Sequence, residues 1–390
     1  MHTKAQIKQL LQDAVAEKIT AGCSLLLIQN GCELLYCEDG YADLEHQLPI
    51  RRNTIYRLYS MTKPVTAAAA MLLMERGMLD LCSPVSDFLP GFAEQKVWAN
   101  GRLTTPKRPV LVKDLLNMTS GLVYSGTDTP SGIASARLFE DISARLDSDS
   151  PLTTLEVANA LGQIPLSYEP GTWWQYGSSA DVLGAVIETV SGVSFGKFLK
   201  KEFFEPLEMS DTGFWVPSEK QPRLARVYSR RENGTLLRYT GCNLGIRNDM
   251  SRPNPFESGG AGLVSTIDDY AHFAQMLLNG GTYRGRRILS PRTVSYFTQG
   301  KLEAVSQQGF SEWLGLPGHT YSNFLRVLLE PGQALTLGSM GEYGWDGWLG
   351  CYFCNCPADN LTILMMMQKT DSGTETFTRK LRNLIFAGLN

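Results

Sequence analysis

The chain has 390 residues, 43% of them hydrophobic, and a formal net charge of -3. This length and apolar content support a sizeable core, in one large or two smaller domains, and argue against disorder. The small negative charge argues against nucleic acid as the main partner, because binding phosphates needs a basic excess. No run of eighteen apolar residues occurs, so we expect no membrane span.

The first residues, Met1 to Gln6, do not begin a signal peptide, in which a positively charged segment is followed by an apolar segment. Residues 7–15 instead space their apolar side chains like one face of a helix. We therefore expect a cytoplasmic protein whose eight cysteines are free thiols. Cys351, Cys354 and Cys356 form the one cluster that suggests a metal, but no second ligand pair accompanies them. We predict no metal and no other cofactor.

Strand-like segments gather at both ends of the chain. Residues 23–29 and 32–37 flank Asn30-Gly31, a pair typical of a two-residue hairpin turn. Near the other end, the predicted elements are strands at 334–339, 350–355 and 361–368 and a closing helix at 375–388.

Between these ends, helical patterns are separated by loops rich in Pro and Gly. They span residues 62–76, 112–118, 155–161, 179–190, 195–204 and 267–278. This order predicts an α+β fold, in which both chain ends build one antiparallel sheet covered by helices. We expect a single catalytic domain, with an α/β lobe of about 1–80 and 255–390 and an inserted, mostly helical lobe of about 81–254. A groove between the sheet and the helical lobe is the expected ligand site.

Two S-x-x-K sequences occur, beginning at Ser60 and at Ser194, and one such match is expected by chance. Charged neighbours around Ser194 indicate a surface helix. Ser60 instead precedes residues 64–74, which are apolar nearly all round and predict a buried helix. Pro64 is tolerated only in the first helical turn, so Ser60 should lie at the helix start, where backbone N–H groups are free.

Residues three apart on a helix share a face, so Lys63 can reach the hydroxyl of Ser60. A serine hydroxyl becomes a good nucleophile only when a base takes its proton. Lysine can be that base only when neutral, and lowering its pKa from about 10.4 to about 7 costs roughly 4 to 5 kcal/mol, which burial and helix dipoles can supply. The alternative is that Ser60 caps a core helix and Lys63 is an ordinary surface cation.

Two further motifs stand out. In residues 169–179, a Pro-Gly turn leads to Tyr176, which directly precedes an amphipathic helix. Residues 343–350 are rich in Gly and Trp and lead into a strand-like run.

With these motifs in this order and at these distances, the chain resembles the serine β-lactamase and penicillin-binding-protein superfamily. The nearest part is its class C β-lactamase-like branch, which includes the family VIII carboxylesterases. The resemblance covers most of the chain and is carried by residues 56–63, 75–81, 112–122, 169–179 and 258–266. It implies that Ser60 is acylated, that Lys63 is the base or proton carrier, and that Tyr176 helps to activate Ser60 and to protonate the leaving group.

The resemblance also assigns roles around these three residues. The backbone N–H groups of Ser60 and Trp348 would form the oxyanion hole. Residues 345–347, Trp-Asp-Gly, occupy the place of the K-T-G strand motif. The residues expected at the substrate are Tyr124, Ser178, Trp345, Asp346 and Gly347.

Departures from the family pattern shift the expected substrate. Ser178 replaces the Asn of Y-x-N and can still hydrogen-bond Lys63. Trp345 replaces the lysine that binds the substrate carboxylate in lactamases and D,D-peptidases, so the sequence favours esters or other neutral acyl donors. Asp346 would repel developing negative charge if it pointed inward, so we expect it to point away or to meet a cationic group on the protein or substrate. Met118 replaces a usual histidine, and its segment is expected to be structural.

We therefore predict a serine hydrolase that acts through an acyl-enzyme on small or medium carboxylic esters. One alternative is a β-lactamase, a D-amino-acid peptidase or an amidase. Another is a non-catalytic, penicillin-binding-like protein. No G-x-S-x-G sequence occurs, which argues against an α/β-hydrolase. The expected partner is a small-molecule ester or amide, with no nucleic acid and no membrane, while the natural substrate and the oligomeric state stay open.

Overall fold

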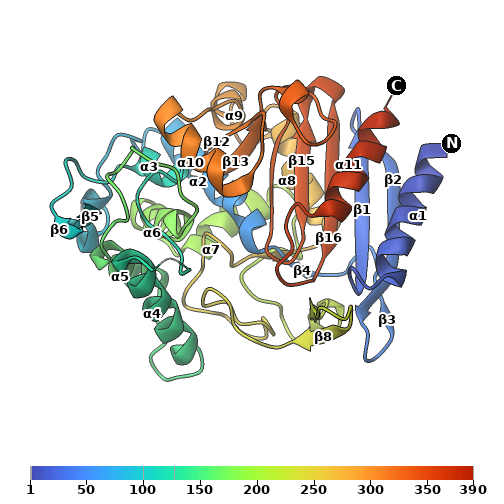
Figure 1. Cartoon of the computed structure of the whole chain (residues 1–390), viewed down its shortest axis with the longest axis horizontal. Helices are drawn as coiled ribbons and strands as arrows, with labels where there is room; N and C mark the ends of the chain where they lie inside the picture. The colour runs from blue at the N-terminus through green and yellow to red at the C-terminus, as the bar shows by residue number, and fades with distance from the viewer. Residues whose placement is uncertain (1, 100, 127, 390) are drawn as a thin grey trace.

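The computed structural model describes residues 2–99, 101–126 and 128–389, and its centre is one eight-stranded antiparallel sheet (Figure 1). In spatial order the strands are β12 (His319–Ser322), β13 (Leu325–Leu328), β14 (Tyr343–Asp346), β15 (Tyr352–Cys356), β16 (Leu361–Met367), β1 (Gly22–Gln29), β2 (Cys32–Asp43) and β3 (Leu48–Pro49). Because β1 pairs with β16, with Leu26 opposite Leu364, the two ends of the chain meet inside the sheet. This confirms the predicted sheet and fold class.

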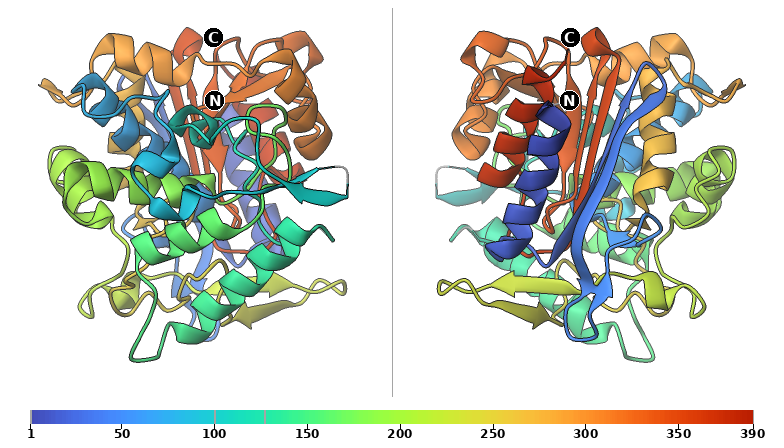
Figure 2. Two further views of the ribbon diagram at one scale, coloured as in Figure 1. Left: turned by 90° about the vertical axis from the view of Figure 1, so that its left-hand side faces the viewer. Right: turned by 90° about the vertical axis from the view of Figure 1, so that its right-hand side faces the viewer.

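Helices cover both faces of the sheet. Helices α1 (His2–Ala16) and α11 (Thr376–Ala387) lie side by side over one face, as the right-hand view of Figure 2 shows. Helices α2 (Thr62–Glu75) and α8 (Ile267–Leu278) pack on the other face. Successive strand residues point to opposite faces, so Leu25 packs with α1 and α11 whereas Leu26 packs with α2 and α8. We call these the outer and inner faces of the sheet, respectively.

Most of the other helices belong to the middle of the chain, which lies beside the sheet on the left of Figure 1. They are α3 (Val112–Leu116), α4 (Pro130–Arg145), α5 (Thr154–Gln163), α6 (Ser179–Ser191) and α7 (Phe195–Leu199), which continues into the π-helical turn η4 (Lys200–Phe204). The hairpin of β5 (Val97–Ala99) and β6 (Arg102–Thr104) lies with these helices, whereas the hairpin of β7 (Val227–Arg230) and β8 (Leu236–Tyr239) lies below the sheet in Figure 1. The lobe boundaries near residues 81 and 254 stay a prediction.

Shorter elements join these parts. They are β4 (Tyr56–Arg57) paired with β9 (Val264–Ser265), β10 (Thr282–Tyr283) paired with β11 (Arg286–Arg287), α9 (Pro291–Thr298) and α10 (Ala304–Leu314). In the described part of the chain, no single helix has the length and apolar content to cross a bilayer; only α6 and Phe195–Phe204 taken together do, and they meet at 76°.

The structure corrects two predicted elements. Residues 334–339 form no strand, although their apolar residues alternate, because Leu335 and Leu337 face solvent with 67% and 51% of their surface exposed. The predicted helix over 195–204 is continuous in direction but changes from α to π geometry at Lys200. The hairpin of β12 and β13 was not predicted from the sequence.

Candidate active site

Ser60 lies in the 3₁₀ turn η1 (Tyr59–Met61), directly before α2, and Lys63 lies in the first turn of α2. Pro64 follows in the same turn, where its missing N–H removes no helical hydrogen bond. Tyr59 has a φ of 45°, in the left-handed region, so the backbone turns sharply just before the nucleophile. The result places Nζ of Lys63 3.1 Å from Oγ of Ser60.

Lys63 is completely buried, whereas Ser60 is partly exposed. Burial lowers the pKa of Lys63 to about 7, against the opposing negative charges of Asp181 and Asp346. Nζ also donates a hydrogen bond to the carbonyl oxygen of Gly260 at 2.8 Å. A buried amine with this pKa is neutral in part of the population at neutral pH, and in that form it can take the proton of Ser60.

Tyr176 comes from the loop before α6 and brings its hydroxyl to the same place. The hydroxyl accepts a hydrogen bond from Nε1 of Trp345 at 3.0 Å, and it interacts with the side chain of Ser60. Nζ of Lys63 lies 4.6 Å from the centroid of the ring. Burial raises the pKa of Tyr176, against the lowering effect of the Ser60 and Trp345 side chains beside its hydroxyl, so the phenol stays neutral and is suited to donating a proton.

Two tryptophans stack on the ring of Tyr176. The centroid of Trp345 lies 5.6 Å away at 29°, and that of Trp313, in α10, lies 4.9 Å away at 23°. Trp345 is only 3% exposed, so its side chain mainly contacts Tyr176 and presents little surface to a substrate. Trp313, in contrast, is 48% exposed. No sequence pattern pointed to Trp313, because only the tertiary fold brings α10 to this site.

Gly347, after β14, packs directly against the backbone that carries the nucleophile. A Cβ atom built on Gly347 would lie 2.2 Å from the carbonyl oxygen of Leu58 and 3.7 Å from the backbone nitrogen of Ser60, so only glycine fits. The next residue, Trp348, places its ring against Tyr59 and donates from Nε1 to Oδ1 of Asp371 at 2.9 Å. The predicted oxyanion hole requires the close approach of Gly347 to the backbone at Ser60. That the N–H groups of Ser60 and Trp348 are its donors stays a prediction.

Asp346 and Trp345 are neighbours on β14, so their side chains leave opposite faces of the sheet. The carboxylate of Asp346 lies 3.6 Å from Nη1 of Arg326 and accepts a hydrogen bond from Oγ1 of Thr374 at 3.2 Å. Burial raises the pKa of Asp346, against the effect of Arg326. The sequence analysis expected Asp346 either to point away or to meet a cationic group. The structure shows that it meets a cationic group of the protein, the guanidinium of Arg326.

The expected hydrogen bond between Ser178 and Lys63 is wrong. Ser178 is the N-cap of α6 and is buried, but its Oγ has no hydrogen-bond partner among the described residues. Lys63 bonds to Gly260 instead, and Asp181 holds Gly260 by accepting from its backbone N–H at 3.0 Å. Asp181 also accepts from Oγ of Ser258 at 2.5 Å.

Asp181 is thus a site residue that the sequence analysis missed. It is 2% exposed and is the one acidic residue in the first half of α6, where most of its neighbours are apolar, which was an available signal. Tyr124, expected at the substrate, donates to Oδ2 of Asp181 at 3.5 Å, and its ring lies 5.6 Å from Nζ of Lys63. Tyr124 therefore forms part of the wall around the amine.

The other sequence candidates lie apart from this site. Ser194 caps α7, where its Oγ accepts from the N–H of Lys197 at 3.4 Å, and Lys197 is exposed. The cysteines at 351, 354 and 356 are buried in or beside β15. Across the described residues, no group of three or more His, Cys, Asp or Glu side chains is placed to hold a metal ion.

The site combines a serine, a buried lysine and a tyrosine, and it lies beside an antiparallel sheet built from both ends of the chain. This combination defines a serine hydrolase that works through an acyl-enzyme. The chain belongs to the Beta-lactamase family, whose model matches residues 7–387.

Relatives support this assignment over nearly the whole chain. Protein Rv1367c of Mycobacterium tuberculosis (strain ATCC 25618 / H37Rv) is 32% identical over 366 residues, which cover 90% of this chain and 86% of that protein. Esterase EstB of Burkholderia gladioli is 28% identical over 398 residues, which cover 98% and 95%. The structure of EstCE1, a hydrolase with promiscuous acyltransferase activity, has a TM-score of 0.83 at 25% identity and covers 99% of both chains. Simvastatin synthase (LovD) from Aspergillus terreus shares the fold, with a TM-score of 0.79 at 22% identity and coverage of 99% of this chain and 98% of that one.

Proposed function

We propose that this protein is an esterase that hydrolyses small or medium carboxylic esters. The observation that carries the proposal is the distance of 3.1 Å between Oγ of Ser60 and the fully buried amine of Lys63. The similarity to esterase EstB and to the hydrolase EstCE1 supports the same chemistry.

Acylation begins when Oγ of Ser60 bonds to the ester carbonyl carbon and Nζ of Lys63 takes the hydroxyl proton. We assign the N–H groups of Ser60 and Trp348 to the oxyanion that forms, each such donor lowering the barrier by roughly 2.7 to 4 kcal/mol. The C–O bond to the alcohol then breaks, and Tyr176 donates a proton to the leaving oxygen while it recovers one from Lys63. In deacylation, water attacks the acyl carbon and gives a proton to Lys63. The bond between the acyl carbon and Oγ of Ser60 then breaks, and Lys63 passes that proton to Oγ, which restores the hydroxyl and releases the carboxylic acid.

The environment of Trp345 favours neutral esters over carboxylated β-lactams. In the place where the resemblance puts a substrate-binding lysine, the chain has a buried indole that donates to Tyr176. An indole N–H carries no charge and is already used, so it offers no anchor for a carboxylate. We infer that Ser178, Gly347 and Tyr124 shape the wall that the ester meets.

Hydrolysis of p-nitrophenyl butyrate tests the proposal. The wild type is expected to turn this ester over, and Ser60→Ala is expected to lower kcat/KM at least 1,000-fold while circular dichroism stays unchanged. Ser194→Ala is the matched control, because Ser194 begins the second S-x-x-K sequence and lies outside the site. Equal ester rates in the wild type and Ser60→Ala would refute the esterase. Faster turnover of a chromogenic cephalosporin would favour the lactamase alternative, and a stoichiometric burst with a fluorescent penicillin would favour the binding-protein alternative.

We also propose that the protein works in a reducing compartment such as the cytoplasm. All eight cysteines are free thiols, and three of them are exposed, Cys32, Cys82 and Cys242. Exposed thiols persist where cellular reductants keep disulfides from forming.

A further inference from the structure

A cavity of about 160 Å³ lies on the outer face of the sheet, on the opposite side of β14 from Tyr176. Strands β12 to β15, helix α11 and the loops at 315–317 and 335–336 surround it. Its charged lining residues are Arg326, Asp346, Arg379 and Arg382. No role in the ester chemistry described above involves this cavity.

Arg326 is the unusual member of the lining. Its side chain is 5% exposed, yet Nη1 has no hydrogen-bond partner among the described residues. The contacts of its guanidinium are a 3.5 Å hydrogen bond from Nη2 to the carbonyl oxygen of Phe353, the 3.6 Å ion pair with Asp346, and the ring of Tyr352 at 4.7 Å. A guanidinium has five N–H donors, so this buried cation has most of its hydrogen-bonding capacity unused.

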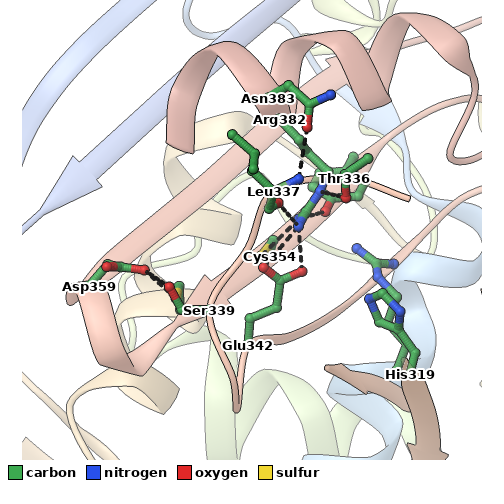
Figure 3. A network of polar contacts seen from close by, with 12 residues as sticks. His319, Thr336, Leu337, Ser339, Glu342, Cys354, Asp359, Arg382 and Asn383 are labelled. Atoms are coloured by element: carbon green, nitrogen blue, oxygen red, sulfur yellow. Dashed lines mark hydrogen bonds and ion pairs between the residues drawn. The ribbon is translucent and has the colours of Figure 1, made fainter. Parts of the chain in front are cut away.

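The two neighbouring arginines, Arg382 and Arg379, have hydrogen-bond partners for their guanidinium groups. Arg382 is fully occupied: it donates to Glu342, Leu337, Thr336 and Tyr352. Figure 3 shows the first three of these partners around its guanidinium. Arg379 donates to the carbonyl oxygen of Thr374 and to Oγ1 of Thr376, and it is only partly buried.

The sum of these charges is positive. Glu342 neutralises Arg382 at 2.7 Å, which leaves Arg326 and Arg379 against the single carboxylate of Asp346. His319, which lies beside the network in Figure 3, adds no charge near neutral pH, because burial and the positive charge of Arg326 lower its pKa to about 4. The cavity therefore suits an anion.

We propose that this cavity is a binding site for one small oxyanion, a carboxylate or a phosphate, held by Arg326 with Arg379 beside it. The planar fork of a guanidinium matches two oxygen atoms of either group. Asp346 competes with the anion for Arg326, and its long 3.6 Å contact leaves Nη1 available. Since Asp346 adjoins Trp345 on β14, the bound anion lies next to the strand that positions Tyr176.

Thermal unfolding in sodium acetate, sodium phosphate and sodium chloride at equal ionic strength tests the site. At saturation, acetate or phosphate is expected to raise Tm by a few °C more than chloride does. Whichever of the two anions gives the larger shift identifies the source of the oxyanion. Equal shifts in all three salts would overturn the proposal.

Variants separate specific binding from general salt effects, because two of them are expected to change the affinity for the anion in opposite directions. Arg326→Gln should abolish the oxyanion-specific shift, while Asp346→Asn, which removes the competing charge, should lower the apparent Kd about tenfold. Arg286→Gln, at an exposed arginine of β11, is the control and should behave as the wild type. If Arg326→Gln does not fold, Arg379→Gln must weaken binding and Asp346→Asn must strengthen it. Unchanged affinity in both of those variants would refute the site.

Discussion

The amine of Lys63 is enclosed on all sides, and its pKa is lowered to about 7, so its charge changes within the pH range in which an enzyme is assayed. The protonated amine cannot accept the proton of Ser60, and the neutral amine can. We therefore expect kcat/KM for a neutral ester to rise with pH and to level off above an apparent pKa of about 7. Below that value it should fall about tenfold for each pH unit.

A pH–rate profile from pH 5 to 9 with p-nitrophenyl butyrate checks this. Lys63→Arg is the companion variant, because arginine keeps its proton throughout this range and should be inactive at every pH. A profile in which activity falls between pH 6 and 8 would contradict Lys63 as the base.

Trp345 acts on Tyr176 through one N–H group. Trp345→Phe keeps an aromatic ring against Tyr176 but removes the 3.0 Å hydrogen bond to its hydroxyl. The expected result is a fall in kcat of about tenfold, with KM changed less than twofold, because the bond orients the proton donor and does not bind the ester. Steady-state kinetics beside Trp98→Phe, in β5, provide the comparison. A rise in KM with unchanged kcat would instead make Trp345 a substrate contact.

At this scale, sequence patterns and the family resemblance pointed to the residues that the structure brings together: Ser60, Lys63 and Tyr176. The partners of Lys63 were not predictable in the same way. Gly260 reaches the amine because Asp181 holds its backbone, and this arrangement depends on how α6 packs beside α2. The error at Ser178 has the same cause, since the carbonyl of Gly260 takes the hydrogen bond expected for the hydroxyl.

At the level of elements, β14 and the turn after it set the distance between the sheet and the nucleophile. Gly347→Ala would drive a Cβ atom to 2.2 Å from the carbonyl oxygen of Leu58, so the turn must move away from Ser60. We expect kcat/KM to fall at least 100-fold, because small displacements of catalytic groups are costly. Gly332→Ala, where a Cβ atom meets open space, is the control for the substitution itself. Full activity in Gly347→Ala would show that the turn does not shape the site.

Sequence patterns predicted one strand incorrectly and missed one hairpin. The strand predicted at 334–339 is an exposed loop, in which the N–H of Leu337 donates to the side chain of Asn383 in place of a strand partner. The missed hairpin of β12 and β13 turns at Asn323 and Phe324, both with positive φ. Without the Gly that marks such turns, this hairpin leaves little local signal.

For the whole molecule, the pairing of β1 with β16 makes the sheet depend on both ends of the chain. The outer face is closed by α1 and α11, and Leu381 of α11 is 2% exposed there. Leu381→Ala should lower the free energy of unfolding by about 2 to 5 kcal/mol through the cavity that it leaves. Leu335→Ala, at a leucine that is 67% exposed, should change it by less than about 0.5 kcal/mol.

Urea unfolding of both variants, followed by tryptophan fluorescence, measures the difference. Similar stabilities would mean that α11 does not close the core. This whole-molecule organisation, with both chain ends in one sheet, was predictable from the sequence because the strand-like runs and the helical patterns fall in separate parts of the chain.

Covalent labelling identifies the nucleophile directly. A p-nitrophenyl alkylphosphonate should react with the wild type at one site, and peptide mass spectrometry should find the adduct on Ser60. Lys63→Met should react far more slowly, because the hydroxyl then lacks its base. An adduct on another serine, or labelling of Ser60 at the same rate without Lys63, would contradict the mechanism.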